Sequence, residues 1–236
     1  IWTTAADKCD WIFCLVRTNP DVKKQEGISF LLIDMDSEGV STTPIALISG
    51  ESEFCQTFFD NVKVPRENLV AGLNQGWSVA KALLVHERKL MAEIGSDSPR
   101  KVMAPNAAAR QYLDFEEGRI SDAQLRSDLV EYDMQMHAIA LTHFRGFEEK
   151  ASGVRSAAPL VMKYLGTEAE KTKSELLLAI MGSRGLGWEG EEFSSEELDA
   201  LRLWAMSKAM TIAGGSSEIQ LNVIAKSVLA LPQPGE

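Results

Sequence analysis

The sequence predicts an α+β fold, in which a small β-sheet or barrel domain is followed by an antiparallel four-helix-type bundle. Two observations support this fold class. Short runs of β-branched and aromatic residues fill the first 65 positions, whereas apolar residues recur every three or four positions from residue 74 onward. The chain has 236 residues, 45% of them hydrophobic, which is enough for a buried core. We therefore predict a β-domain at residues 1–70 and a helical bundle at residues 71–236.

Four strands are expected in the first domain. Each run has the length of a single strand and is bounded by Asn-Pro, Gly or Asp-Asn turn signals. The predicted strands cover residues 10–17, 27–33, 40–48 and 54–64. Val64 and Pro65 then end the β region.

Long amphipathic helices are expected in the second domain. In the first of them, residues 74–94, Trp77, Ala80 and Leu84 lie at helical spacing. After a break at 95–99, the other predicted helices cover residues 100–117, 121–150, 155–180, 198–212 and 216–229. The stretch 182–190 is too rich in glycine for a helix interior and is predicted to be a loop. Candidate N-caps are Ser121 with Gln124, Ser194 or Ser195 ahead of Glu197, and Ser216 or Ser217.

Composition excludes several classes of function. With 24 Lys+Arg against 34 Asp+Glu, the formal charge is −10, which argues against nucleic-acid binding as the main role. No segment approaches the roughly 20 apolar residues of a membrane span. Three cysteines without CxxC spacing, and His137 and His143 six residues apart, do not form a metal motif. We expect a reduced, cytoplasmic protein, and because the chain opens with Ile1 inside a strand pattern, we expect a segment ahead of it.

The most informative local pattern is the stretch from Gly214 to Gln220. Two adjacent glycines let the backbone approach a ligand closely, and Ser216 or Ser217 can cap a helix whose N-terminus favours negative charge. The alternative is an ordinary capped helix without a ligand.

Here the sequence resembles a known family. The motifs GGSSEIQ (residues 214–220) and AKSVLALP (residues 225–232) resemble the C-terminal signature of the acyl-CoA dehydrogenases, FAD-dependent enzymes that oxidise CoA thioesters. A second block resembles the family's middle β-domain and comprises IWTT (1–4), DWIF (10–13), GISFLL (27–32), FFDNVKVP (58–65), NLV (68–70) and GW (76–77). The β block is most similar to bacterial enzymes of the pimeloyl-CoA dehydrogenase large-subunit type. The resemblance covers nearly the whole chain.

The resemblance implies positions for the flavin. Trp2 would lie against the isoalloxazine ring and the Thr4 hydroxyl near its N5 atom, while Gly215, Ser216 and Glu218 fall where relatives contact FAD. The alternative for Trp2 is an aromatic anchor in the core of the sheet.

The resemblance also implies catalytic groups. Many members carry a basic glutamate where this chain has Gly214, but a minority, similar to isovaleryl-CoA dehydrogenase, use the Glu of a Glu-Arg pair on the helix after the β-domain. Glu87 is that residue here, and an apolar acyl pocket would strengthen it as a base; a solvated helix face or an ion pair is the alternative. Arg88 is assigned to substrate binding, with a structural ion pair as the alternative. The Gly214 N–H would donate to the thioester carbonyl.

Some family features are absent. The Arg-x-x-Phe-Gly segment that contacts FAD phosphates in relatives is not recognisable, Gly182-Ser183-Arg184-Gly185 only partly matches the flavin-packing Gly-Gly-x-Gly loop, and the amino-terminal helical domain is missing. We predict an acyl-CoA dehydrogenase that passes electrons to an electron-transfer flavoprotein and forms a homotetramer or heterotetramer. The alternatives are a non-catalytic partner subunit of a heteromeric enzyme, and an acyl-CoA oxidase or flavin monooxygenase of the same fold.

Overall fold

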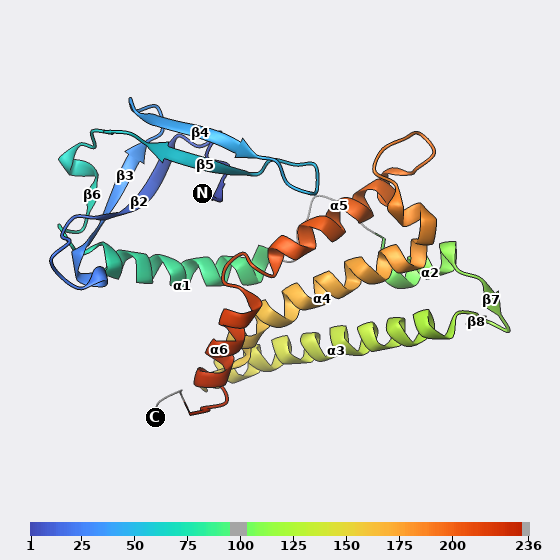
Figure 1. Ribbon diagram of the computed structural model, residues 1–236. Coiled ribbons are helices and arrows are strands. Elements are labelled where there is room, and N and C mark those ends of the chain that lie inside the picture. Colours follow the sequence, from blue (N-terminus) through green and yellow to red (C-terminus); the bar gives the residue numbers. More distant parts are fainter. Residues whose placement is uncertain (95–102, 233–236) are drawn as a thin grey trace. The chain divides into compact units, whose positions relative to one another are not determined.

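The structure is a computed structural model that describes residues 1–94 and 103–232 (Figure 1). The chain divides into two compact units, Ile1–Lys89 and Leu90–Glu236, and each is described by itself. The predicted domain boundary at residue 70 lies ahead of helix α1 (Gly76–Ile94), and the first unit includes most of this helix.

Two small antiparallel sheets form the first unit. One sheet has the order β1-β5-β4 and the other the order β2-β3-β6. The strands are β1 (Thr3–Thr4), β2 (Trp11–Arg17), β3 (Ile28–Asp34), β4 (Val40–Ile45), β5 (Phe54–Phe59) and β6 (Leu69–Val70), with 3-10 turns η1 (Lys24–Gly27) and η2 (Arg66–Asn68). All four predicted strands are present. The fourth ends at Phe59 instead of residue 64, because Asn61 adopts a left-handed backbone (φ 52°) that interrupts an extended chain.

Strand β3 fixes the start of α1. The buried Ser29 hydroxyl accepts a hydrogen bond from the Asn74 N–H (2.8 Å) and lies 2.7 Å from the Thr18 hydroxyl. Gly76 packs so closely on β3 that an added Cβ would lie 2.4 Å from the Ser29 carbonyl carbon. The first turn of α1 is therefore held against the sheet by hydrogen bonds and by a contact that only glycine permits.

Long helices form the second unit, as predicted. They are α2 (Pro105–Tyr112), α3 (Ala123–Ala151), α4 (Ala158–Met181), α5 (Ser195–Met210) and α6 (Ser217–Ser227), with the 3-10 turn η3 (Gly182–Leu186) and the hairpin β7 (Phe115–Glu116) and β8 (Arg119–Ile120). Helix α4 packs against α2, α3, α5 and α6, so it is the central helix of this unit. The predicted α+β fold class is confirmed.

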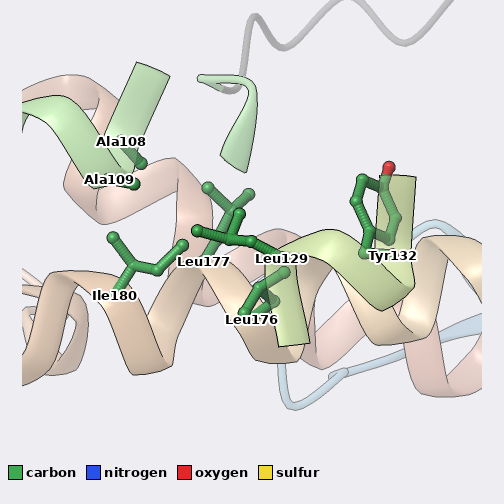
Figure 2. Packing of buried hydrophobic residues seen from close by; sticks show 7 residues of the cluster. All are labelled: Ala108, Ala109, Leu129, Tyr132, Leu176, Leu177 and Ile180. Carbon is green, nitrogen blue, oxygen red and sulfur yellow. The ribbon is translucent and has the colours of Figure 1, made fainter. Parts of the chain in front are cut away.

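The core of the second unit lies where α2, α3 and α4 meet (Figure 2). Its buried side chains are Ala108, Ala109, Leu129, Tyr132, Leu176, Leu177 and Ile180. Burial raises the pKa of the Tyr132 hydroxyl to about 12.

Two sequence-based predictions about this unit are wrong. The helix predicted at residues 100–117 ends at Tyr112, because Glu117 (φ 48°) and Gly118 (φ 78°) form the left-handed turn of the β7–β8 hairpin; its first residues lie outside the described part of the chain. Ser121 is not the N-cap of α3. The Asp122 carboxylate caps this helix instead and accepts hydrogen bonds from the N–H groups of Gln124 and Leu125.

The other cap predictions are confirmed. Ser194 and Glu197 form a complete capping box at the start of α5, and Ser216 is the N-cap of α6. Within the described residues, no helix combines the length and the apolar character that crossing a membrane requires.

Candidate functional site

The α5–α6 turn, residues 211–217, contains the motif that the sequence singled out. Gly214 (φ 65°) and Gly215 (φ 107°) both adopt backbone conformations that side chains disfavour. A Cβ at Gly215 would also lie 2.7 Å from Nε2 of Gln220. The two glycines are therefore needed for the shape of the turn itself.

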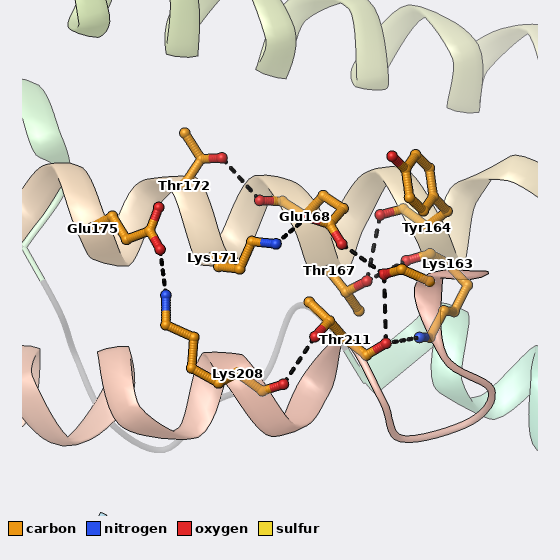
Figure 3. Close-up of polar contacts among 10 residues, drawn as sticks. Lys163, Tyr164, Thr167, Glu168, Lys171, Thr172, Glu175, Lys208 and Thr211 are labelled. Atoms are coloured by element: carbon orange, nitrogen blue, oxygen red, sulfur yellow. Dashed lines mark hydrogen bonds and ion pairs between the residues drawn. The ribbon is translucent and has the colours of Figure 1, made fainter. Parts of the chain in front are cut away.

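The carbonyl groups of the α5–α6 turn are held from within the bundle. The Lys163 ammonium, on α4, donates to the carbonyl of Gly215 (2.6 Å) and lies 3.4 Å from that of Thr211, a contact drawn in Figure 3. Nε2 of Gln220 donates to the Gly214 carbonyl (3.2 Å). Burial lowers the pKa of Lys163, although the neighbouring Glu168 carboxylate acts in the opposite direction.

The N–H groups of the same turn are unpaired. Among the residues that the structure describes, the N–H groups of Gly214, Gly215 and Ser216 have no hydrogen-bond acceptor. Gly214 is exposed. Because the carbonyls are bound and the N–H groups are open, the turn offers donors to a carbonyl or to a negatively charged group.

Polar side chains secure the first turn of α6. The Ser216 hydroxyl accepts from the Ile219 N–H (3.5 Å), and the Ser217 hydroxyl donates to Glu168 of α4 (2.6 Å). Lys171 and then Ser217 lower the pKa of Glu168 through hydrogen bonds. Glu218 is exposed, and a hydrogen bond from Ser216 lowers its pKa. This end of α6 is therefore fixed to α4 while its outer side remains open.

In the first unit, Trp2 and Thr4 lie on the exposed surface of β1. The Trp2 side chain is 58% exposed and meets Phe54 edge-on, with ring centroids 6.2 Å apart. Thr4 is exposed, whereas the Thr3 hydroxyl between them accepts a hydrogen bond from Thr57 (3.2 Å). Trp2 is thus not a buried anchor within this sheet, and its ring is available to a planar ligand.

Glu87 lies on α1 and is exposed. Leu83 and Leu84, four and three residues earlier and so on the same side of the helix, are 36% and 41% exposed. The carboxylate therefore has apolar neighbours that a ligand could cover. The side chain of Arg88, predicted to bind substrate, lies outside the described part of the structure.

Sequence reasoning missed a buried polar cluster around Glu197. This carboxylate is 3% exposed and accepts hydrogen bonds from Arg184 (2.7 and 2.6 Å), Tyr112 (3.0 Å) and the Ser194 N–H (2.7 Å). The guanidinium also donates to the Glu192 carbonyl. Arg184 thus ties the η3 turn to α5. The capping-box glutamate was the signal, but nothing in the sequence pairs it with Arg184.

Comparisons with known proteins were made for the whole chain. The family model "Acyl-CoA dehydrogenase, C-terminal domain" matches residues 74–229. The chain is 31% identical to acyl-CoA dehydrogenase FadE34 of Mycobacterium tuberculosis over 240 residues, which cover 99% of this chain and 30% of that protein. It is 30% identical to acyl-CoA dehydrogenase IpdE1 of Mycolicibacterium smegmatis over 238 residues, 99% of this chain and 56% of that protein.

A solved structure agrees with these matches. The structure titled "Tcur3481-Tcur3483 steroid ACAD" is 25% identical, with a TM-score of 0.80, and the alignment covers 99% of this chain and 59% of that chain. The chain therefore spans between about a third and three fifths of the length of the relatives it matches.

Proposed function

Because the chain belongs to the acyl-CoA dehydrogenase family, we propose that it carries out α,β-dehydrogenation of an acyl-CoA thioester with FAD as the oxidant. The family expected from the sequence is confirmed by the match over residues 74–229. The likeness to pimeloyl-CoA dehydrogenases stays a prediction. The observation that carries the proposal is the α5–α6 turn, whose bound carbonyls leave the Gly214 N–H free for a thioester oxygen.

The exposed groups fit a flavin. Trp2 presents an aromatic face, Thr4 presents a hydroxyl, and Gly215 and Ser216 present unpaired N–H groups at the start of α6. We assign these residues and Glu218 to FAD binding. When bound, the flavin supplies the acceptor for the hydride that leaves the substrate's β-carbon.

Glu87 is proposed to remove the α-proton. Its carboxylate takes the proton from the substrate's α-carbon, and the C–H electron pair moves toward the thioester carbonyl. Leu83 and Leu84 would contact the acyl chain and exclude water from the carboxylate, which makes it a stronger base. Arg88, the next residue, is assigned to substrate binding.

Gly214 is proposed to stabilise the charge that develops on the thioester oxygen. A backbone N–H needs no side chain and cannot compete as a base, so glycine at this position is compatible with Glu87 as the base. Loss of one such donor typically costs about 10²–10³ in rate.

The wider context is also proposed from the family. Electrons would leave through an electron-transfer flavoprotein, and the protein would work in the cytoplasm as a homotetramer or heterotetramer. A second candidate function, a non-catalytic subunit in a heteromeric dehydrogenase, is favoured by the paired name of the solved relative and by the short span of this chain along its relatives.

A Glu87→Gln variant tests the catalytic proposal. The protein and the variant are assayed with a panel of acyl-CoA thioesters and an artificial electron acceptor, after the bound flavin has been measured by absorbance. The variant should lose about 10²–10⁴ in kcat, the usual contribution of a positioned base, while keeping its flavin. His86→Gln, at the exposed neighbouring position on α1, is the matched control and should stay within about twofold of the unaltered protein.

Three results would decide against the proposal. Full turnover in Glu87→Gln rules out this base. No bound flavin together with no turnover favours the non-catalytic subunit. Rapid reoxidation of the reduced flavin by air, measured by stopped flow, favours an oxidase or monooxygenase.

A further inference from the structure

The Gly214–Gly215 pair cannot fix its own orientation. Both residues lack a Cβ, so steric restriction of the adjoining peptide planes is weak and their direction depends on hydrogen bonds. The peptide plane that carries the Gly214 N–H lies between the carbonyls of Thr211 and Gly215 in the chain. Restraint of both carbonyls therefore limits this plane from both sides.

Lys163 contacts both of these carbonyls. Its ammonium donates to Gly215 (2.6 Å) and lies within hydrogen-bonding distance of Thr211 (3.4 Å), and it reaches them from α4, the central helix of the unit. Among the described residues, Lys163 is the only partner of the Gly215 carbonyl. The Thr211 carbonyl also accepts the Ser217 N–H (3.0 Å), which closes the turn.

We infer that Lys163 is a positioning residue, whose ammonium holds the α5–α6 turn so that the Gly214 N–H stays directed outward. The inference rests on the proposed function for its catalytic consequence, but the holding of the turn is independent of any activity. A lysine suits this position because its compact ammonium offers three donors and can serve two carbonyls together. Lys163 acts through the backbone and is not assigned a contact with the substrate.

The test compares Lys163→Met with the control Lys173→Met. Methionine keeps much of the apolar stem and removes the donors. Lys173 lies on the same helix and pairs with Glu170 (3.1 Å). Hydrogen exchange of the Ser217 amide, whose bond to Thr211 closes the turn, is measured by NMR without substrate. Exchange should be about tenfold faster in Lys163→Met and unchanged in Lys173→Met.

Kinetics separate positioning from a merely structural role. With acyl-CoA thioesters, kcat of Lys163→Met should fall about ten- to a hundredfold while KM stays within about threefold, because the donor acts mainly in the transition state. Lys163→Arg keeps charged donors and should recover part of both losses. If methionine prevents folding, Lys163→Gln gives the same comparison with a shorter, neutral donor.

Unchanged Ser217 exchange in Lys163→Met would overturn the inference. Faster exchange with undiminished kcat would also overturn it, since the turn would then be held without any effect on catalysis. An unaltered protein that binds flavin but shows no turnover would refute the proposed function, and the exchange data alone would then decide whether Lys163 holds the turn.

Discussion

Replacement of Arg184 by glutamine tests how the η3 turn is held on the bundle. The hydrogen bonds from Arg184, followed by those from Ser194 and Tyr112, lower the pKa of Glu197 from 4.5 to about 2. This difference corresponds to about 3 kcal/mol, at about 1.4 kcal/mol for each factor of ten. The Arg184 side chain is 42% exposed, so water screens the pair and we expect its removal to cost about 1–2 kcal/mol at pH 7.

The pH dependence follows from the direction of this change. Because the pKa of Glu197 is lower in the folded chain than its ordinary value of 4.5, the stabilisation is fully present above about pH 5 and is lost as the pH falls toward 2. At pH 3 less than half of the difference between the unaltered protein and Arg184→Gln should remain.

Urea denaturation followed by circular dichroism, at pH 7 and pH 3, measures these free energies of unfolding. Arg145→Gln is the matched control, because Arg145 forms a 2.8 Å pair with Glu149 but is 64% exposed, and its loss should cost less than about 0.5 kcal/mol at either pH. An equal loss at both pH values in Arg184→Gln would refute the charge argument. Arg184 would then act through its packing on Phe193, whose ring centroid lies 4.8 Å from the guanidinium carbon.

Three further substitutions test the fold by urea and thermal denaturation. Leu177→Ala, in the core where this side chain is 2% exposed, should lower the free energy of unfolding by about 2–4 kcal/mol through loss of burial and the cavity left behind. Ser216→Ala should cost about 0.5–1 kcal/mol, because the cap of α6 is a long 3.5 Å bond. Gly76→Ala should cost about 1–3 kcal/mol through the 2.4 Å contact with β3, whereas Gly166→Ala in α4, where a Cβ would meet no atom within 4 Å, should be neutral or stabilising.

Local patterns predicted most elements because local forces define them. The helical spacing of apolar residues predicted α4 and α6, and serine followed three residues later by glutamate predicted the capping box at Ser194 and Glu197. The β7–β8 hairpin was missed because its charged residues are compatible with a helix, and only Gly118 signals the turn. The cap of α3 was misassigned because Ser121 and Asp122 are adjacent and both are good caps, so their order alone does not decide between them.

The groups that hold the candidate site were beyond the reach of such patterns. The motif identified Gly214, Gly215 and the Ser216 cap, since the properties of glycine and of an N-cap are local. Lys163 is 52 residues from Gly215 in sequence, and they meet because α4 packs against α6. A lysine in the middle of a helix has the same local pattern whether it faces water or a neighbouring turn. The residues that present a backbone donor can therefore be predicted from sequence, whereas those that orient it depend on which helices pack together.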